Sequence, residues 1–460
     1  MKTFKLLVTL FALVWLTSCI EDGFSTTERL EFSTDTVAFD TVITLQGSAT
    51  KQMVVYNRGK KQVRISSIKV TGSATGGRFF LNVDGQRGDV FHDVEVRGGD
   101  SIYVFVEGYI NEMKSDDPTF VKDFIEFDVN GATQRVVLTA WGQDVVRFHG
   151  DTLRRSQHFT DVKPYLIYDT LFVPPGVTLT LDPGTRLLFH DKGALRCYGT
   201  LRAMGTREKP ISMRGDRLDH VVAQIPFEIM SGQWGGLILG PTSYGNELQY
   251  VDMSGSSIGI HTSAPDTTRR ALHIFNSILR NSSSSILTSG GAWIDAEGSV
   301  LSDAASAVAN FIGGRVNFVN CTLANYYLFK ALEEPIVNFY VQDDGKVVDV
   351  LHAEFVNCIV HGLTQELNMP KLDKTNCFMR NCLFKSGGED DSHFFNCVWQ
   401  ADPKFYTHRE TYLFDYRLQE GSDAIGKGDA SRCPASARYD RYGNDRFAGP
   451  LDVGAFVYKP

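Results

Sequence analysis

Apolar and polar positions alternate in short runs between residues 30 and 145. Alternation with a period of two puts apolar side chains on one face of a strand and therefore predicts half-buried β-strands. Turn signals such as Asn130-Gly131 separate the runs and favour antiparallel neighbours. Several such strands in one span predict a β-sandwich. The runs cover residues 36–43, 53–56, 63–70, 101–106, 124–129 and 135–140.

From residue 146 the pattern changes to a repeated short segment with a period near 22 residues. Each copy has an apolar pair, an Asx or Gly residue, and then a small residue. The Asx/Gly positions are Asp252, Asn276, Gly298, Asn320, Asn357, Asn381 and Asn396. Asparagine tolerates left-handed backbone angles, and stacked amides can bond to one another. The following small positions, expected to form an inward column, are Ser277, Ser299, Cys321, Cys358, Cys382 and Cys397.

A period near 22 residues with only short strands predicts the coils of a parallel β-helix. Residues 177–189, 194–203, 210–213 and 234–238 resemble the first coils of right-handed parallel β-helix proteins, and residues 416–428, 440–446 and 452–456 resemble their closing segment. The resemblance, to the pectate-lyase-like superfamily, covers about residues 165–460. It implies the fold more than an activity, because that superfamily holds lyases, hydrolases, epimerases, adhesins and inert binders.

The predicted fold class is therefore all-β, with a right-handed parallel β-helix preceded by an immunoglobulin-like β-sandwich. The strand order of the sandwich resembles the immunoglobulin-like modules of bacterial envelope proteins, which implies a spacer or adhesion role. The expected domains are residues 1–18, a lipoprotein signal peptide; 19–29, a linker; 30–145, the sandwich; and 146–460, the β-helix with its closing segment.

The N-terminal segment predicts export. Lys2 and Lys5 precede an apolar run over residues 6–16, which is too short for the ~20 residues of a membrane span. Residues 16–19, ending in Cys19, resemble a bacterial lipobox, which implies lipidation of Cys19 and a membrane partner. The alternative is an ordinary signal peptide. Glu21 and Asp22 resemble the acidic export signal of surface lipoproteins, so we expect an outer-membrane location facing the exterior, with a periplasm-facing location as the alternative.

Net charge and cysteine content limit which classes of partner and cofactor the chain is expected to bind. The chain has 46 Lys and Arg against 54 Asp and Glu, and its net charge of −8 without a basic run argues against nucleic acid. Four cysteines occupy the repeated small position, which favours buried thiols over disulfides. His361 and His393 lie near cysteines, but without a CxxC or HExxH motif we predict neither a metal nor a cofactor.

One segment interrupts the strand pattern. Residues 214–234 concentrate Asp216, Arg217, Asp219 and His220 and end at Trp234. As a ligand site, the charged groups would bind a cation or sugar hydroxyls and Trp234 would offer a stacking face. The alternative is an insert pinned to the flank of the helix by its own ion pairs.

Catalysis on a β-helix would need carboxylates on adjacent coils, at spacings near 22 residues. Asp252 aligns with Asn276, and Asp295 aligns with His273 and Asn317, so no acidic ladder is predicted and the catalytic residues stay unassigned. We therefore expect a lipid-anchored envelope protein that binds a polysaccharide or acts as an adhesin or scaffold. The alternative is a polysaccharide lyase or glycoside hydrolase with an active site built from loops.

Overall fold

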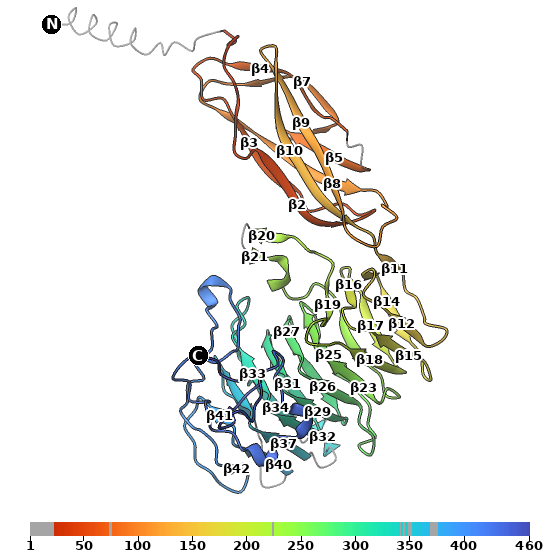
Figure 1. The fold of residues 1–460 in the computed structure, drawn as a ribbon, viewed down its shortest axis with the longest axis vertical. Coiled ribbons are helices and arrows are strands. Elements are labelled where there is room, and N and C mark those ends of the chain that lie inside the picture. Colours follow the sequence, from red (N-terminus) through yellow and green to blue (C-terminus); the bar gives the residue numbers. More distant parts are fainter. Residues whose placement is uncertain are drawn as a thin grey trace, which may run out of the picture. The chain divides into compact units, whose positions relative to one another are not determined.

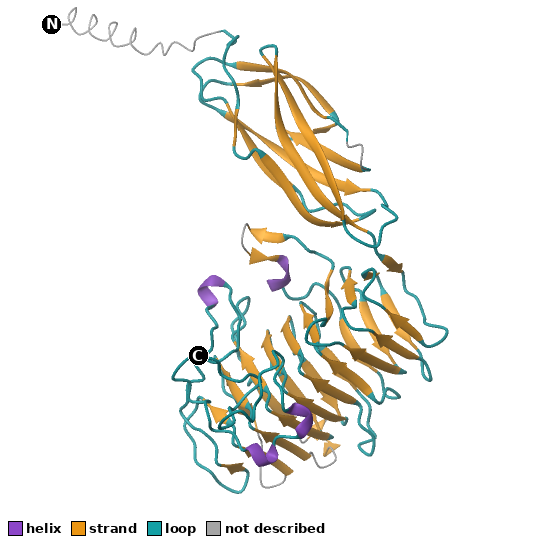
Figure 2. Cartoon of the chain, viewed as in Figure 1, coloured by secondary structure: helices purple, strands orange, loops and turns teal. Residues whose placement is uncertain are grey.

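The computed structural model describes residues 23–72, 76–222, 225–340, 342–343, 346–347, 352–368 and 376–460. The chain forms two compact units that divide between Asp144 and Val145. Regular structure in the described residues is almost entirely β (Figure 2). The predictions for residues 1–22, including lipidation of Cys19 and the export signal at Glu21 and Asp22, lie outside the described residues.

Two five-stranded sheets build the N-terminal unit (Figure 1). The first has the order β1 (Glu31–Phe32), β3 (Lys51–Tyr56), β8 (Ser101–Ile110), β5 (Gly77–Val83) and β6 (Gln86–Gly88). The second has the order β2 (Thr36–Ile43), β10 (Ala132–Gln143), β9 (Thr119–Val129), β4 (Val63–Val70) and β7 (Val90–Val96).

The alternation read from the sequence places one face of each sheet in a shared core. Val104 and Val106 of β8 and Ile125 and Phe127 of β9 are all fully buried in the same cluster, although their strands belong to different sheets. The expectation that all neighbours run antiparallel is wrong for one pair, because β2 and β10 are parallel. These strands lie at opposite ends of the unit's sequence, so no hairpin fixes their direction.

In the second unit the chain cycles repeatedly through three parallel sheets, the arrangement of a parallel β-helix (Figure 1). Sheet 1 contains β11 (Val146–Phe148), β13 (Tyr165–Ile167), β16 (Arg186–Phe189), β19 (Ile211–Gly215), β24 (Val251–Ser254), β27 (Ile278–Ser282), β30 (Val300–Ala304), β33 (Thr322–Asn325), β38 (Ile359–Gly362) and β41 (Leu383–Phe384). Sheet 2 contains β14 (Thr170–Val173), β17 (Ala194–Cys197), β22 (Gly236–Leu239), β25 (Ile260–Thr262), β28 (Leu287–Gly290), β31 (Ala309–Ile312), β34 (Val337–Tyr340) and β39 (Leu367–Asn368).

Sheet 3 contains β12 (Gln157–Phe159), β15 (Thr178–Leu181), β18 (Thr200–Met204), β23 (Asn246–Gln249), β26 (Leu272–Phe275), β29 (Trp293–Glu297), β32 (Arg315–Val319), β37 (His352–Val356), β40 (Asn376–Arg380) and β42 (Phe394–Phe395). Two small hairpins leave the coils, formed by β20 (His220–Val222) with β21 (Ile225–Pro226) and by β35 (Gln342–Asp343) with β36 (Lys346–Val347). The short 3-10 helices are η1 (Phe227–Ile229), η3 (Arg409–Thr411), η4 (Ala430–Arg432) and η5 (Ala435–Ala437).

The repeated bend joins sheet 3 to sheet 1 and has left-handed angles, as predicted. The positions with positive φ are Tyr250, Asn276, Gly298, Asn320, Asn357, Asn381 and Asn396. Tyr250 therefore takes the place predicted for Asp252, which instead pairs with Ile278 on sheet 1. At Gly298 an added Cβ would lie 2.3 Å from the Asn276 Oδ1, which explains a glycine at this rung.

The asparagine amides contact a partner that the sequence did not suggest. Asn357 donates to the carbonyl oxygen of Asp429 at 3.1 Å and accepts from the Asp429 N–H at 2.7 Å, and Asn320 donates to the Asp452 carbonyl at 3.3 Å. The closing segment (residues 401–460) thus binds the column of bends along its flank. The prediction that stacked asparagine amides bond to one another is wrong for Asn320 and Asn357, which bond to the closing segment instead. In the closing segment Arg446 is buried and donates to three backbone carbonyls, of Ala437, Gly454 and Ala455.

Seven cysteines among the described residues are free thiols. The column at the small position is present, because Cys321, Cys358 and Cys382 are buried in the helix interior. Ser277 and Ser299 occupy the same column and are linked by a bond from the Ser277 N–H to the Ser299 Oγ at 3.0 Å. Burial of the Cys358 thiol among its stacked neighbours raises its pKa well above the usual value, as expected for an unreactive interior thiol.

Candidate functional site

A cleft of about 620 Å³ lies over the outward face of sheet 1. Its floor comes from β19, β24, β27 and β30, and its walls come from the insert after β19 and from the closing segment. We call it the sheet-1 cleft. It is lined by Arg207, Pro210, Ser212, Arg214, Glu228, Asp252, Met253, Ser254, Ile278, Arg280, Val300, Ser302, Leu413, Phe414, Asp415, Tyr416, Arg441, Tyr442 and Phe456.

Glu228 forms the charged centre of the cleft. It lies in η1, and its carboxylate pairs with Arg214 of β19 and with Arg280 of β27, each at 2.8 Å. The hydroxyl of Ser254 on β24 donates to the same carboxylate at 3.1 Å. Burial alone would raise the pKa of Glu228, but Arg280 and Arg214 outweigh it and hold the pKa below its usual value. Glu228 is therefore an ionised acceptor at neutral pH.

Asp252 is the second carboxylate of the cleft. Its desolvation by the surrounding walls raises its pKa although 43% of its side chain is exposed, and the nearby Glu228 charge acts in the same direction. Arg441 of the closing segment opposes this shift, because its Nη2 contacts both carboxylate oxygens at 2.7 Å. Glu228 and Asp252 thus have pKa values displaced in opposite directions, the arrangement that separates a base from an acid in many active sites.

Aromatic side chains line the wall built by the closing segment. Tyr442 is 49% exposed and packs against Phe456 with ring centroids 5.3 Å apart. The Arg417 guanidinium lies 5.8 Å from the ring centroid of Tyr406 and 5.7 Å from that of Tyr442. Exposed rings beside charged hydrogen-bonding groups offer a sugar both a stacking face and partners for its hydroxyls.

A smaller cavity of about 90 Å³ adjoins the cleft through Glu228, Arg280 and Phe414. Asp303 lies at this cavity, and burial raises the pKa of its carboxyl. The hydroxyl of Tyr416 donates to Asp303 at 2.6 Å, and burial also raises the pKa of this tyrosine. The closing segment therefore supplies a hydrogen bond to a buried acid beside the cleft.

The five site residues predicted in the insert lie elsewhere. Trp234 is fully buried, stacks on Phe189 at 4.1 Å and donates to the Ser254 carbonyl, so its ring offers no face to a ligand. Arg217 makes a two-pronged pair with Asp219 at 2.6 and 2.7 Å. The carboxylate of Asp216 lies 2.7 Å from the His190 Nδ1.

His220 begins β20. In the part of the chain that the structure describes, Asp216, Arg217, Asp219, His220 and Trp234 are all absent from the lining of the cleft. Within the insert, Arg217 pairs with Asp219 and Arg214 pairs with Glu228, and a ligand role for the five residues stays a prediction. The insert's contribution to the cleft comes instead from Arg214 and Glu228.

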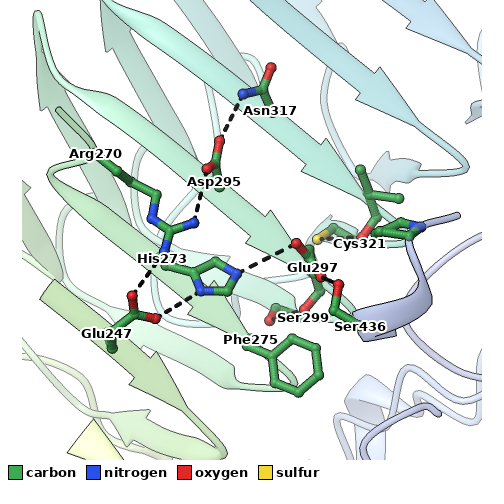
Figure 3. Close-up of polar contacts among 12 residues, drawn as sticks. Glu247, Arg270, His273, Phe275, Asp295, Glu297, Ser299, Asn317, Cys321 and Ser436 are labelled. Carbon is green, nitrogen blue, oxygen red and sulfur yellow. Dashed lines mark hydrogen bonds and ion pairs between the residues drawn. The ribbon is translucent and has the colours of Figure 1, made fainter. Parts of the chain in front are cut away.

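A second polar cluster lies on the outward face of sheet 3, and Figure 3 shows how its side chains point toward one another across neighbouring strands. Strand register puts Glu247, His273, Asp295 and Asn317 in one row. His273 Nδ1 lies 2.8 Å from the Glu247 carboxylate. The Arg270 guanidinium lies between two carboxylates in the network, 2.9 Å from Glu247 and 3.3 Å from Asp295. The expected alignment of Asp295 with His273 and Asn317 is confirmed, but the row does contain acids on alternate coils.

His273 is mostly buried in this cluster, which we call the sheet-3 row. Burial would lower its pKa, but Glu247 at 2.8 Å and Glu297 at 3.6 Å outweigh it and raise the pKa to about 9. Glu297 also accepts from the Ser436 hydroxyl of the closing segment at 2.7 Å. Among the described residues no group of three or more His, Cys, Asp or Glu side chains could hold a metal ion. The contacts that the sheet-3 row makes are those of a hydrogen-bonded ionic network.

The residues of the two clusters that the sequence does not predict are hidden for different reasons. The sequence pattern places Asp252 at the bend, two positions away from its true register, and so hides the outward direction of its side chain. Glu247 precedes His273 by 26 residues because the coil between them is longer than the period of 22. Arg441 and Tyr442 belong to the closing segment, for which no periodicity exists. Within the insert, an arginine at its start, Arg214, is followed by an acid, Glu228, and this opposite charge is the feature of the sequence that could have indicated the pair.

Comparison of the chain with protein-family models and with curated protein sequences finds no match. Among the described residues, no helix has the length and apolar character needed to cross a membrane.

Proposed function

We propose that this protein binds a glycan in the sheet-1 cleft and is held at the outer membrane by a lipid on Cys19. In this proposal the second unit is a right-handed β-helix of the pectate-lyase-like type, and the first is an immunoglobulin-like sandwich. The leader sequence supports the lipid anchor, and Glu21 and Asp22 support display on the cell exterior rather than toward the periplasm.

One observation carries the binding proposal. Glu228, Asp252 and the arginines paired with them lie in the same 620 Å³ cleft as the exposed ring of Tyr442. Sugars present apolar ring faces and many hydroxyls, so a site for them needs aromatic surface beside hydrogen-bonding groups. The volume of the cleft falls within the ~300–1,000 Å³ range of ligand sites.

A lyase or hydrolase is the second candidate, favoured by the opposite pKa displacements of Glu228 and Asp252. A glycoside hydrolase needs one protonated and one ionised carboxyl group around the bond that it breaks. Here Asp252 would be the acid and Glu228 the base or nucleophile. The pairing of each carboxylate with arginine favours binding, because it occupies oxygens that catalysis would need free.

The test incubates the mature chain with a panel of acidic and neutral polysaccharides and measures retention in affinity electrophoresis together with products. Tyr442→Ala removes the exposed ring of the cleft. Tyr439→Ala is the matched control, because this ring is also 49% exposed but does not line the cleft. We expect retention without products, weakened by Tyr442→Ala and unchanged by Tyr439→Ala.

Other outcomes would change the assignment. Unsaturated products absorbing in the ultraviolet would indicate a lyase, and new reducing ends without that absorbance would indicate a hydrolase. In either case Glu228→Gln and Asp252→Asn should abolish product formation. Absence of both retention and products across the panel would contradict a glycan ligand in the cleft. Cys19→Ala should separately abolish labelling with radioactive palmitate, and persistent labelling would contradict the anchor.

A further inference from the structure

The outward face of the first sheet in the N-terminal unit has a hollow of about 290 Å³ between β5 and β8. It is lined by Thr50, Phe80, Asn82, Arg87, Phe105 and Glu107. Strand register brings these side chains together, because Asn82 of β5 is opposite Phe105 of β8 and Phe80 is opposite Glu107. These are the outward positions of strands whose alternate residues fill the core, so packing of the core does not require them.

Aromatic rings extend the hollow along β8. Tyr103 is 49% exposed and stacks on Phe105 with ring centroids 6.4 Å apart and an angle of 26° between the planes. Phe80 lies beneath two guanidinium groups, those of Arg78 at 4.8 Å and Arg87 at 5.4 Å. The result is an aromatic surface bordered by hydrogen-bond donors, on the central strand of the sheet rather than at its edge.

The charges around the hollow cancel. Arg87 pairs with Glu107 at 3.3 Å, and Arg78 pairs with Asp89 at 3.1 Å. Both arginines are more than 60% exposed, so their donors can turn toward a ligand at little cost. A hollow with balanced charge and both donors and acceptors matches a ligand that is uncharged and rich in hydroxyls.

One polar atom in the hollow lacks a partner within the described chain. The Asn82 Oδ1 is buried and accepts no hydrogen bond from the described residues. A buried acceptor without a donor costs free energy, so its presence needs an explanation beyond folding. Asn82 as a whole is partly exposed, so a rotation of its side chain would turn this oxygen toward the hollow, where a ligand hydroxyl would supply the missing donor.

We propose that this hollow is a second binding site, specific for a neutral saccharide whose sugar ring stacks on Phe105 and whose hydroxyl donates to Asn82. The proposal is independent of the sheet-1 cleft, because every residue that carries it belongs to the N-terminal unit. Because β8 is hydrogen-bonded on both sides, by β3 and β5, a partner strand cannot add to its backbone. Recognition must therefore come from side chains, which suits a saccharide better than a polypeptide strand.

The experiment measures the affinity of the full mature chain for soluble glucomannan, xyloglucan and mixed-linkage β-glucan by affinity electrophoresis, with polygalacturonate and heparin as acidic probes. Phe105→Ala removes the stacking face, and Asn82→Ala removes the unpartnered acceptor. Trp141→Ala is the matched control, since Trp141 is 48% exposed on β10 of the other sheet. Tyr442→Ala reports on the sheet-1 cleft.

We expect at least one neutral polysaccharide to retard the chain and Phe105→Ala to weaken that affinity about tenfold or more. Asn82→Ala should weaken it as well while leaving the melting temperature unchanged or higher, because the substitution removes an unsatisfied buried group. This combination separates loss of binding from loss of folding. Trp141→Ala should leave that affinity unchanged, and Tyr442→Ala should leave in place the part of the retardation that Phe105→Ala removes.

Four results would overturn the proposal. These are no retardation by any neutral probe, retardation by the acidic probes alone, equal weakening by Trp141→Ala, and retardation that Tyr442→Ala abolishes but Phe105→Ala does not. The last result would place the binding in the sheet-1 cleft, and would support the proposed function while contradicting the second site.

Discussion

Strands of 11 and 12 residues, β9 and β10, run through the N-terminal unit, whereas the described strands of the three parallel sheets have at most five residues each. A long antiparallel strand has its register fixed by many cross-strand pairs and by its turns. A short strand in a coil has few pairs of its own, so the bends and the closing segment must hold it in register. The two units therefore depend on different residues for their stability.

The largest expected effect comes from substitutions in the cores of the two units. Phe127→Ala deletes a fully buried ring that packs between the two sheets of the N-terminal unit, and should cost about 3–5 kcal/mol. Differential scanning calorimetry should show a lower melting temperature for the transition of that unit alone. Phe318→Ala, which removes a ring stacked on Phe355 at 5.0 Å, should lower only the other transition. A shift of both transitions by either substitution would contradict independent units.

The next effect tests the bends of the coils. Asn357→Ala removes two hydrogen bonds to Asp429 and puts alanine at a φ of 53°, so we expect a loss of about 3 kcal/mol. Asn357→Gly keeps the left-handed angle and loses only the bonds, which should cost about 2 kcal/mol. Urea titration of both variants separates the two contributions. Equal stability of wild type and Asn357→Ala would show that the closing segment does not hold this bend.

The third effect concerns buried charge. The sheet-3 row contains buried charged groups, whereas ion pairs of the N-terminal unit such as Arg58 with Glu31 are exposed. The pKa of His273 is raised to about 9 in the folded chain, above the ordinary value near 6.5. Its contribution to stability is therefore fully present below about pH 6.5 and declines as the pH rises through about 9.

A pKa raised from about 6.5 to about 9 corresponds to roughly 3 kcal/mol in the unfolding free energy. His273→Gln should remove that part of the pH dependence between pH 6.5 and 9.5, measured by urea unfolding of the second unit. His158→Gln is the control, because this histidine is exposed at 68%. If His273→Gln and wild type showed parallel pH profiles, the histidine would not be charged in the folded chain.

The smallest expected effect tests whether the cysteines of the interior column serve only packing. Cys358→Ser should cost about 1 kcal/mol or less, because a hydroxyl at this rung can donate to the Val356 carbonyl as Ser299 donates to the Glu297 carbonyl at 2.9 Å. The measurement is urea unfolding under reducing conditions. A loss larger than that of Asn357→Ala would mean that the thiol has a role beyond packing.

The comparison also explains what could be read from the sequence. In the N-terminal unit the apolar runs over residues 36–43, 63–70 and 124–129 each lie in an observed strand, and 124–129 alternates throughout. The sequence does not predict strand β7, because two polar residues in succession, His92 and Asp93, interrupt its alternation, and both are exposed. In the second unit Asn276, Asn320 and Asn357 were found because a left-handed bend restricts the residue type.

The candidate site was less predictable, for physical reasons. The cleft combines outward residues of sheet 1 with an insert and with the closing segment, so residues far apart in the sequence meet in it: Arg441 contacts Asp252 across 189 residues. Nothing in local periodicity constrains such a contact. Outward residues of a coil also have no apolar pattern to mark them, and a charged insert attracts attention to residues such as Asp216 and Arg217 that serve its own pairing.

The attachment of the closing segment to early coils has a consequence for how the chain matures. Arg441 is synthesised long after Asp252 and Asn276, yet it binds both. While the chain is being synthesised, the amides at the bends of these coils remain without these partners until the closing segment has been made. Contacts of such sequence separation form slowly. Docking of this stretch is therefore the step that completes the second unit, and a product cut short before residue 441 would leave the cleft without one wall.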